Sequence, residues 1–371
     1  METIVSKSVE FRIPLWLASL DLKKAFDRIE WSALFHALQV QNVPQEYCTL
    51  LAALYDGQVG SLGQNGQFDI TRGVKQGDVL SPMLFNAGLE IAIRRWKQML
   101  TTEGVLIGAG CDDNRLTNVR FADDLVLYAN SAEELARMLD LLAEELAKVG
   151  LTLNAKKSKI FTTCSDHVNS DVPIFLDAAG DFIEVARAAD LHKYLGCMIP
   201  GDLKRRGRAN LEHRLHCAWA KFGMFKHALT DKHVDMKLRL RLLDAVVTPC
   251  ALYGLTASPL TKKDEEQLSL AQRKMLRLMV GYVKAAGDSW ADMYRQLRVK
   301  VDKALQKHPV RCWKETLHEN KSRLFGQVSA GIRNNLTCKV ALWQPDITVD
   351  SKLVSKPARG RGRPRIKWIN A

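Results

Sequence analysis

The first strong hydrophobic signal is an almost continuous apolar run over residues 13–20 that stops at Asp21. Its length and its lack of polar alternation predict a strand buried on both faces. Beyond Asp21, apolar residues recur every three or four positions from Trp31 to Leu38, which predicts an amphipathic helix. A carboxylate at the end of a buried strand is well placed to meet a metal ion, although a lone aspartate is more often a helix cap.

Further elements are predicted before residue 100. Periodicity indicates a helix over residues 44–55 and a second helix over residues 81–96. Between them, turn residues indicate a hairpin whose strands cover residues 58–62 and 67–71. The hairpin is marked by Asn65-Gly66, a strong turn signal. Gly73 and Gly77 lie in the loop before the second helix, which Ser81 is expected to cap. Glycines ahead of a helix let backbone N–H groups approach a phosphate or a base pair closely.

The unusual stretch is Phe121-Ala122-Asp123-Asp124-Leu125, where two strand-like runs have the spacing of a hairpin with a two-residue turn. Such turns usually carry Asn-Gly or Asp-Gly, so two adjacent carboxylates break a local rule, which is typical of functional sites. Two unit charges about 4 Å apart repel by roughly 4 kcal/mol at the effective dielectric of a protein surface. The pair therefore predicts a divalent cation with oxygen ligands, Mg²⁺ or Mn²⁺, and a third carboxylate from elsewhere would strengthen this prediction.

The rest of the chain is increasingly helical. Ser131 and Glu134 are spaced as a capping box, and the apolar stripe behind them predicts a helix up to Gly150. Helical periodicity with many basic residues then predicts three helices, over residues 210–227, 233–247 and 263–280.

Charge is divided unevenly along the 371 residues. Residues 1–190 hold 18 Lys and Arg against 26 Asp and Glu, a net charge of −8, whereas residues 191–371 hold 36 against 15, a net charge of +21. An acidic first half and a basic second half indicate a metal-using core joined to a polyanion-binding region. The alternative is that the basic residues only solvate helices.

The spacing of the cysteines and the length of the apolar runs argue against a zinc-binding protein and against a membrane-spanning one. The 8 cysteines are scattered, without a C-x-x-C pair or a histidine at zinc-ligand spacing, which favours free thiols in a reducing compartment. No run approaches the roughly 20 apolar residues that span a membrane. We therefore expect no membrane partner.

Taken in order, these motifs resemble those of reverse transcriptases of non-LTR, LINE-type retrotransposons. The resemblance rests on separated motifs in the family's order: Leu20-Asp21-Leu22 with Ala25-Phe26-Asp27, Gly73-Val74 to Ser81-Pro82, Phe121-Ala122-Asp123-Asp124, Gly150-Leu151 to Lys157-Ser158, and Tyr194-Leu195-Gly196. It covers residues 13–200, and the basic helical segment 203–281 is similar to the family's thumb. The implied fold class is α+β: a polymerase palm, with an antiparallel sheet packed on helices in a ferredoxin-like core, followed by an α-helical thumb.

The resemblance implies an RNA-directed DNA polymerase that joins a dNTP to the 3′-hydroxyl of a DNA primer on an RNA template. Asp21, Asp123 and Asp124 would be its catalytic residues and would hold two Mg²⁺ ions, or Mn²⁺, roughly 3.5–4 Å apart. One ion would lower the pKa of the primer hydroxyl, and both would stabilise the charge of the transition state.

The resemblance also implies nucleotide-binding residues. Phe26 would crowd the sugar 2′ position and reject ribonucleotides, the alternative being simple core packing. Gln76 and Gly77 would lie against the incoming nucleotide and the template.

Lys157 would approach the triphosphate and give a proton to pyrophosphate, a role equally open to Lys156 or Lys159. Further basic residues are candidates for nucleic-acid binding: Lys204, Arg205, Arg206, Arg208, Arg361, Arg363 and Arg365. The last three surround a Gly-Arg-Pro segment that resembles minor-groove hooks, a generic basic tail being the alternative.

Three regions are expected along the chain. They are a palm over residues 1–200 with a remnant of the fingers hairpin at about 57–75, a basic thumb-like domain over 201–290, and a poorly patterned basic region over 291–371 whose tail, 351–371, is predicted to be disordered.

The family places a fingers region before the first palm motif, and only 20 residues precede Asp21. A truncated chain with weak or absent polymerase activity is therefore expected. The alternative function is a catalytically dead nucleic-acid-binding remnant; an RNA-templated RNA polymerase or a nucleotide cyclase with the same palm fits less well. The family's habit of copying at chromosomal DNA implies a nuclear location.

Overall fold

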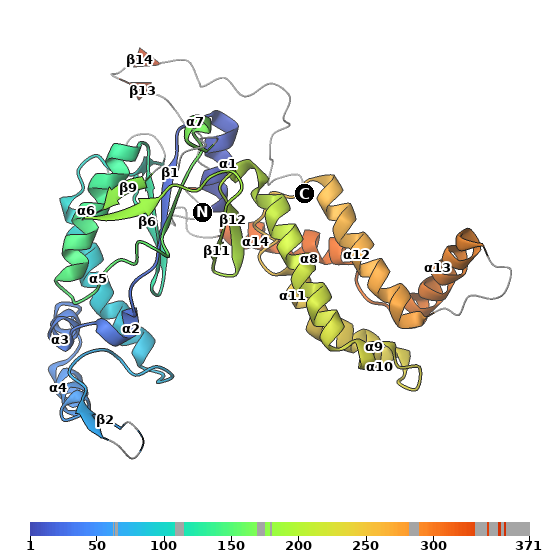
Figure 1. Ribbon diagram of the computed structural model, residues 1–371, viewed down its shortest axis with the longest axis horizontal. Helices are drawn as coiled ribbons and strands as arrows, with labels where there is room; N and C mark the ends of the chain where they lie inside the picture. Colours follow the sequence, from blue (N-terminus) through green and yellow to red (C-terminus); the bar gives the residue numbers. More distant parts are fainter. Residues whose placement is uncertain are drawn as a thin grey trace. The chain divides into compact units, whose positions relative to one another are not determined.

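The chain forms two units. The computed structural model describes residues 1–61, 63, 66–107, 115–168, 175–178, 180–281, 289–330, 340, 348–349 and 352–353. Among these, residues 7–195 form the first unit, and residues 196–330 with residues 2–6 form the second. In Figure 1 the first unit runs from blue to green, and most of the second runs from yellow-green to orange. The division falls in the turn at Leu195-Gly196, close to the expected boundary at residue 200.

A four-stranded antiparallel sheet lies at the centre of the first unit. In spatial order its strands are β6 (Asn118–Phe121), β7 (Asp124–Ala129), β1 (Trp16–Leu20) and β8 (Lys159–Thr162). β1 thus has a neighbour on each side. All residues of β1 are buried, which confirms the predicted strand, although it begins at Trp16 and not at residue 13.

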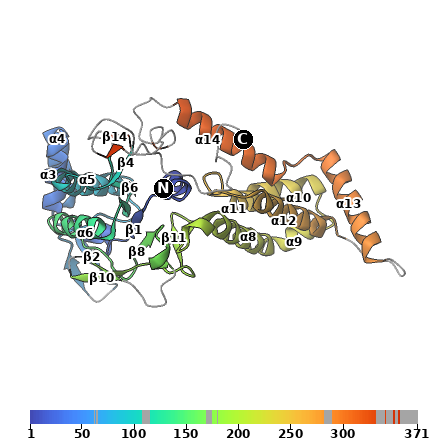
Figure 2. The ribbon, with the colours of Figure 1, turned by 90° about the horizontal axis from the view of Figure 1, so that it is seen from above.

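Helices build the core on one face of this sheet, as both Figure 1 and Figure 2 show. α6 (Ala132–Ala147) packs on β1 and β7, α5 (Ser81–Met99) packs on α6, and α3 (Trp31–Val40) packs on α5. Because side chains alternate along a strand, Trp16, Ala18 and Leu20 of β1 enter this core. Trp96 is fully buried there, and its indole Nε1 donates a hydrogen bond to the Met138 carbonyl at 2.9 Å. The residues of β1 between these point to the other face, where the site lies.

Smaller elements complete the first unit. They are α1 (Glu2–Phe11), which the sequence did not predict, α2 (Ala25–Arg28), α4 (Gln45–Tyr55), the hairpin β2 (Val59–Ser61) with β3 (Gln67–Asp69), β4 (Val105–Leu106) with β5 (Arg115–Leu116), α7 (Ser165–Val168), β9 (Phe175–Ala178) with β10 (Asp181–Glu184), and β11 (Leu191–Tyr194). The first residues of α1 are assigned to the second unit. The expected hairpin at 58–71 is present, and its Asn65 lies outside the described residues.

The second unit is helical. Its elements are β12 (Cys197–Pro200), η2 (Leu203–Arg205), α8 (Arg206–Met224), α9 (Lys226–Thr230), α10 (Met236–Leu242), the π turn η3 (Leu243–Val247), α11 (Thr248–Leu252), α12 (Lys262–Val280), α13 (Trp290–Lys307) and α14 (Trp313–Ala330). Two further short strands, β13 (Thr348–Val349) and β14 (Lys352–Leu353), pair with each other and are assigned to the first unit. The α+β class and the helical second part are as predicted.

The expected boundary at residue 290 is wrong. α13 and α14, which were expected to be poorly patterned, both pack on α12. Trp313 at the start of α14 is fully buried in the core of this unit. Its backbone N–H donates to Gln272 Oε1 at 2.8 Å, and its indole Nε1 donates to Thr248 Oγ1 at 2.8 Å. Residues 290–330 therefore belong to the same helical unit.

Among the described residues, no helix combines the length and the apolar character that crossing a bilayer requires.

Candidate active site

The site is built where β1 ends and β7 begins. Leu20 pairs with Leu125 in the antiparallel register of these strands, so the next position places Asp21 opposite Asp124. Side-chain alternation puts both carboxylates on the face of the sheet that points away from α6. A strand pairing across about a hundred residues of sequence therefore brings two acids together.

The predicted hairpin is present, but its turn is one residue earlier than expected. Phe121 pairs with Asp124, so the two turn residues are Ala122 and Asp123, and Asp124 is the first residue of β7. Ala122 has a φ of 53°, the left-handed conformation that primed hairpin turns require at their first position. A non-glycine residue is strained there, and such strain is typical of functional sites.

Asp21 is held by the segment that follows α6. Asn154 donates its side-chain amide to Asp21 Oδ2 at 2.9 Å and its backbone N–H to the Asp21 carbonyl at 2.8 Å. The Asp21 backbone N–H in turn donates to Ser158 Oγ at 3.1 Å. These contacts fix the backbone and one carboxylate oxygen of Asp21.

A cavity of about 400 Å³ joins these acids to basic side chains. It is lined by Ser19, Leu20, Asp21, Asp124, Lys156, Lys157, Lys159, His192, Lys193 and Tyr194. Lys159 forms ion pairs with Glu184 and Asp190, whereas Lys156 and Lys157 are exposed. A cavity lined by both carboxylates and lysines suits a polyanion whose charge is shared with a cation.

Electrostatics in the cavity follow from burial and from the acid pair. Burial, and then the charges of Asp123 and Asp21, raise the pKa of Asp124 above its usual value. Burial, and then the negative charge of Asp124, raise the pKa of Tyr194 to about 12. The uncompensated repulsion at Asp124 is the condition that a bound cation would relieve.

His192 and Asn154 are site residues that the sequence did not single out. Burial, and then Lys159, lower the pKa of His192, whose Nε2 lies 3.1 Å from Ser19 Oγ. A lone histidine carries no motif. Asn154, however, opens the basic run that ends at Lys159, and that run pointed to this region.

A divalent cation fits the donor chemistry of this site. Asp21 and Asp124 offer the hard oxygen ligands that such ions prefer, and burial, together with the charges of Asp123 and Asp21, raises the pKa of Asp124. Within the described residues, however, no three His, Cys, Asp or Glu side chains are grouped as a ready metal site. The structure thus brings two of the three predicted carboxylates together, and Asp123 lies beside them in the turn, outside the cavity lining.

The other predicted nucleotide-binding residues lie elsewhere in the first unit. Gln76 lines a cavity of about 920 Å³ that also contains Asp27, and its Nε2 donates to Asp27 Oδ1 at 3.5 Å. Phe26 is half-buried in α2, stacked on Phe85 of α5 with ring centroids 4.6 Å apart. Gly77 follows in the same loop with a φ of 89°. Neither Phe26, Gln76 nor Gly77 is in the lining of the cavity around Asp21 and Asp124.

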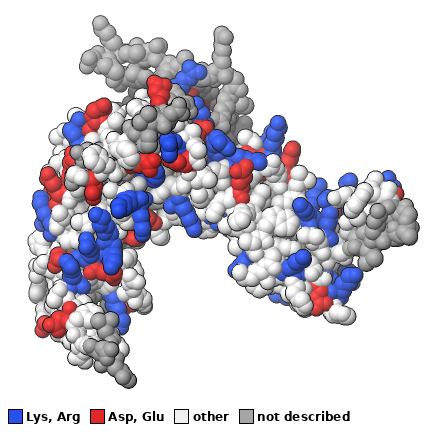
Figure 3. Space-filling model, in the orientation of Figure 1, with Lys and Arg blue, Asp and Glu red and all other residues white. Residues whose placement is uncertain are grey.

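The predicted nucleic-acid-binding residues of the second unit differ in availability. Lys204 and Arg205 are exposed, whereas Arg208 forms ion pairs with Glu212 and Asp264. Figure 3 shows exposed basic side chains over both units.

Arg206 was predicted wrongly to bind nucleic acid. It is 4% exposed, its Nε donates to Glu2 Oε2 at 2.7 Å, and its other nitrogens donate to the Leu203 carbonyl and to Ser6 Oγ. Arg361, Arg363 and Arg365 lie outside the described residues.

An antiparallel sheet backed by helices, with two carboxylates meeting at adjoining strand ends, defines a palm-type polymerase domain. Residues 11–199 match the family model described as reverse transcriptase (RNA-dependent DNA polymerase), and the chain belongs to this family.

Relatives among known proteins come from retrotransposable elements. The Pol polyprotein from a type-2 element of Drosophila melanogaster is 36% identical over 147 residues, which are 38% of this chain and 13% of that protein. The Pol polyprotein from the type-1 element R2 of Bradysia coprophila is 28% identical over 286 residues, 75% of this chain and 31% of that protein. The chain spans less than two thirds of the length of these relatives. Among solved structures, apo telomerase from Candida tropicalis is 13% identical over 92% of this chain and 56% of that chain, with a TM-score of 0.40.

Proposed function

We propose that the first unit catalyses RNA-directed DNA synthesis, joining a dNTP to the 3′-hydroxyl of a DNA primer on an RNA template. The observation that carries this proposal is the placement of Asp21 opposite Asp124, in one cavity with Lys156 and Lys157. Family membership supports the reaction class. The cavity supplies the two features that nucleotidyl transfer needs, which are acids for a divalent cation and bases for phosphates.

Asp21 and Asp124 would hold the divalent metal ions, for which we propose two Mg²⁺ with Asp123 as a third ligand. Such ions, when bound, polarise the reacting oxygens and stabilise the charge of the transition state. The hydrogen bond from Asn154 to Asp21 Oδ2 orients that carboxylate and leaves its second oxygen available. The hydrogen bond from the Asp21 backbone N–H to Ser158 Oγ keeps the carboxylate at the strand end, so the chain arranges its ligands before a substrate arrives.

The lysines would bind the phosphates of the incoming nucleotide. Lys159 is already neutralised by Glu184 and Asp190, so the role of proton donor to pyrophosphate falls to Lys157 or Lys156. Both are exposed and line the cavity with Asp21 and Asp124. Lysine ammonium groups act here as point charges, without the fixed fork geometry of arginine.

Phe26 is proposed to select deoxyribonucleotides. Its stacking on Phe85 holds the ring in one orientation while part of its surface stays accessible. A ring fixed in this way can exclude a 2′-hydroxyl by volume alone. If Phe26→Ala does not raise ribonucleotide incorporation relative to dNTP incorporation, this assignment is wrong.

The nucleic-acid partners are proposed to be the RNA template and the DNA primer, with Lys204 and Arg205 of the second unit among their exposed contacts. The family's use of chromosomal DNA leads us to propose a nuclear location.

Primer extension on an RNA template tests the function. Extension that requires Mg²⁺ or Mn²⁺ and is lost in Asp123→Ala supports it, and would also refute the expectation of an inactive chain. A folded protein that binds the primer–template but extends nothing contradicts the proposal for this chain and favours the nucleic-acid-binding alternative.

A further inference from the structure

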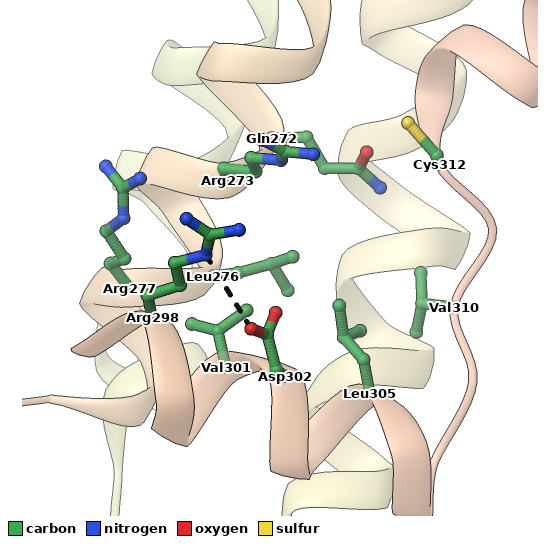
Figure 4. A pocket seen from close by; sticks show the side chains of 10 residues that line it. All are labelled: Gln272, Arg273, Leu276, Arg277, Arg298, Val301, Asp302, Leu305, Val310 and Cys312. Carbon is green, nitrogen blue, oxygen red and sulfur yellow. Dashed lines mark ion pairs between the residues drawn. The ribbon is translucent and has the colours of Figure 1, made fainter. Parts of the chain in front are cut away.

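A second cavity lies in the second unit, between α12, α13 and the segment before α14. Its volume is about 280 Å³. Figure 4 shows that Leu276, Val301 and Leu305 form an apolar floor. Arg273, Arg277 and Arg298 form a basic rim around it. This volume is just below the roughly 300–1,000 Å³ of pockets that enclose a whole small ligand. It therefore suits one base or one phosphate group of a longer molecule.

The positive charge of the three arginines on the rim exceeds the negative charge of the carboxylates that line the cavity. The lining acid is Asp302, whose Oδ2 lies 3.9 Å from Arg298 Nε (Figure 4). Because both side chains are mostly exposed, at 81% and 59%, this pair is screened by water and leaves the rim basic. Among the described residues, neither Arg273 nor Arg277 forms an ion pair with a carboxylate. The groove is thus built to attract an anion.

Two exposed aromatic side chains continue from this groove along α13. Trp290 and Tyr294 are 66% and 54% exposed, and they lie one helical turn apart, with Arg298 one turn further on. The Arg277 guanidinium lies 5.7 Å from the centroid of the Tyr294 ring, so the aromatic stripe and the arginine rim form one surface. Figure 3 shows basic side chains gathered at the end of this unit that α12 and α13 form. Large aromatic side chains whose surface is mostly accessible are typical of binding surfaces.

We propose that this surface, formed by Arg273, Arg277, Trp290, Tyr294 and Arg298, binds single-stranded nucleic acid. Bases would stack on Trp290 and Tyr294, and phosphates would contact the arginines. Aromatic faces beside basic groups bind unpaired bases, because every base offers a flat face once it is released from a duplex. A duplex hides those faces, so the surface favours single strands. The site uses residues of the second unit only and does not depend on the proposed polymerase chemistry.

Fluorescence anisotropy with labelled oligouridylate and oligothymidylate of about 12 nucleotides tests the proposal on the full chain. Trp290→Ala and Tyr294→Ala are each expected to weaken binding by about 5- to 100-fold, the loss of one stacked base. Trp290→Phe and Tyr294→Phe keep a stacking face and are expected to bind within about threefold of the wild type. Arg298→Gln is expected to lower the slope of log affinity against log salt by about 0.7, one phosphate contact on a single strand.

Arg295→Gln is the matched control. Arg295 is on the same helix and 76% exposed, but it is paired with Asp292 at 3.0 Å and lies off the Trp290–Arg298 stripe. It is expected to leave both affinity and salt slope unchanged. Equal affinity for the two oligonucleotides supports recognition of the shared base and phosphate chemistry, and tighter oligouridylate binding assigns the site to RNA.

The proposal is overturned if the alanine variants, shown by circular dichroism to be folded, bind both single strands as the wild type does. It is also overturned if Arg295→Gln weakens binding as much as Arg298→Gln, or if all losses are as large for a duplex as for a single strand. Primer extension on a preformed short primer–template is expected to be unchanged in these variants. Failure of this site and failure of the polymerase proposal are therefore separate results.

Discussion

Asp21, the residue directly after β1, faces Asp124, the first residue of β7, one step beyond the Leu20–Leu125 pair. The buried leucines set the strand register, and the register in turn sets the acids against each other. A slip of one residue in this register would turn every side chain of the strand to the opposite face of the sheet. The same register therefore places the apolar residues in the core and the two acids in the site. The core that stabilises the first unit therefore also assembles its candidate chemistry.

Asp124→Asn is expected to stabilise the fold while removing catalysis. The folded protein raises the pKa of Asp124, so the folded state binds a proton more readily than the unfolded chain does. The stability cost of ionising Asp124 is present in full above the folded pKa and disappears as pH falls to the unfolded value. At neutral pH the variant should gain about 1 kcal/mol, or about 2–4 °C in Tm. Thermal unfolding between neutral and acidic pH measures this, and a gain that does not shrink on acidification would contradict it.

Divalent cations are expected to stabilise the wild type through the acid pair. Saturation at about a hundredfold the Kd adds roughly 2.7 kcal/mol to the free energy of unfolding, and a chelator removes it. Thermal shift with Mg²⁺ or Mn²⁺ should therefore move the wild type but neither Asp21→Asn nor Asp124→Asn. Glu144→Gln, an exposed acid on α6, is the control and should respond like the wild type. Equal shifts in all four proteins would place the cation elsewhere.

Gly73→Ala is expected to cost far more than Gly77→Ala. Both glycines have a positive φ, 87° and 89°, but a Cβ on Gly73 would lie 2.7 Å from the Asp27 carbonyl oxygen, whereas one on Gly77 meets nothing within 4 Å. Gly77→Ala should therefore show only the conformational cost of about 1 kcal/mol, and Gly73→Ala should also push the loop away from Phe26 and Asp27.

Chemical denaturation measures the loss of stability in Gly73→Ala and Gly77→Ala. The ratio of deoxyribonucleotide to ribonucleotide use measures whether the loop has moved away from Phe26. Indistinguishable variants would mean that the close approach of the loop to α2 is not needed.

Trp313→Ala is expected to destabilise the second unit by about 3–5 kcal/mol, because it empties a buried site and leaves the Thr248 hydroxyl without its indole partner. Trp290→Ala is the matched control, since that indole is 66% exposed and its loss should change the unfolding free energy by less than about 0.5 kcal/mol. Urea unfolding compares the two. Similar small losses would show that residues 290–330 do not share the core of this unit.

Local patterns in the sequence predict much of the first unit. The apolar run ending at Asp21, the stripe of α6 and the pair of carboxylates after Phe121 each carry their signal within a few residues. The facing of Asp21 and Asp124 does not, because it depends on a strand pairing between distant segments. The position of the turn was missed for a related reason: the pairing of Asp124 with Phe121 of β6, and not the apolar spacing, makes Asp124 a strand residue.

In the second unit, the sequence-based predictions for Arg206 and for the helix α13 were wrong, because charge and weak periodicity do not show which residues are buried. Arg206 looks like one of a basic cluster, yet Glu2, at the far end of the chain, pairs with it and buries it. α13 contacts the core through a narrow stripe that includes Leu297 and Val301, too few apolar positions to stand out among its charges. Composition thus indicates a basic helical unit but not which of its charges are free.

A double-mutant cycle on single-turnover primer extension tests the central claim most directly. If Asp21 and Asp124 act as one unit, each Asn substitution alone should slow nucleotide addition by at least about 10³-fold, and the double variant should be no slower than either single one. Additive losses, with the double variant slowed by the product of the single effects, would contradict the account, as would extension at the wild-type rate in either single variant.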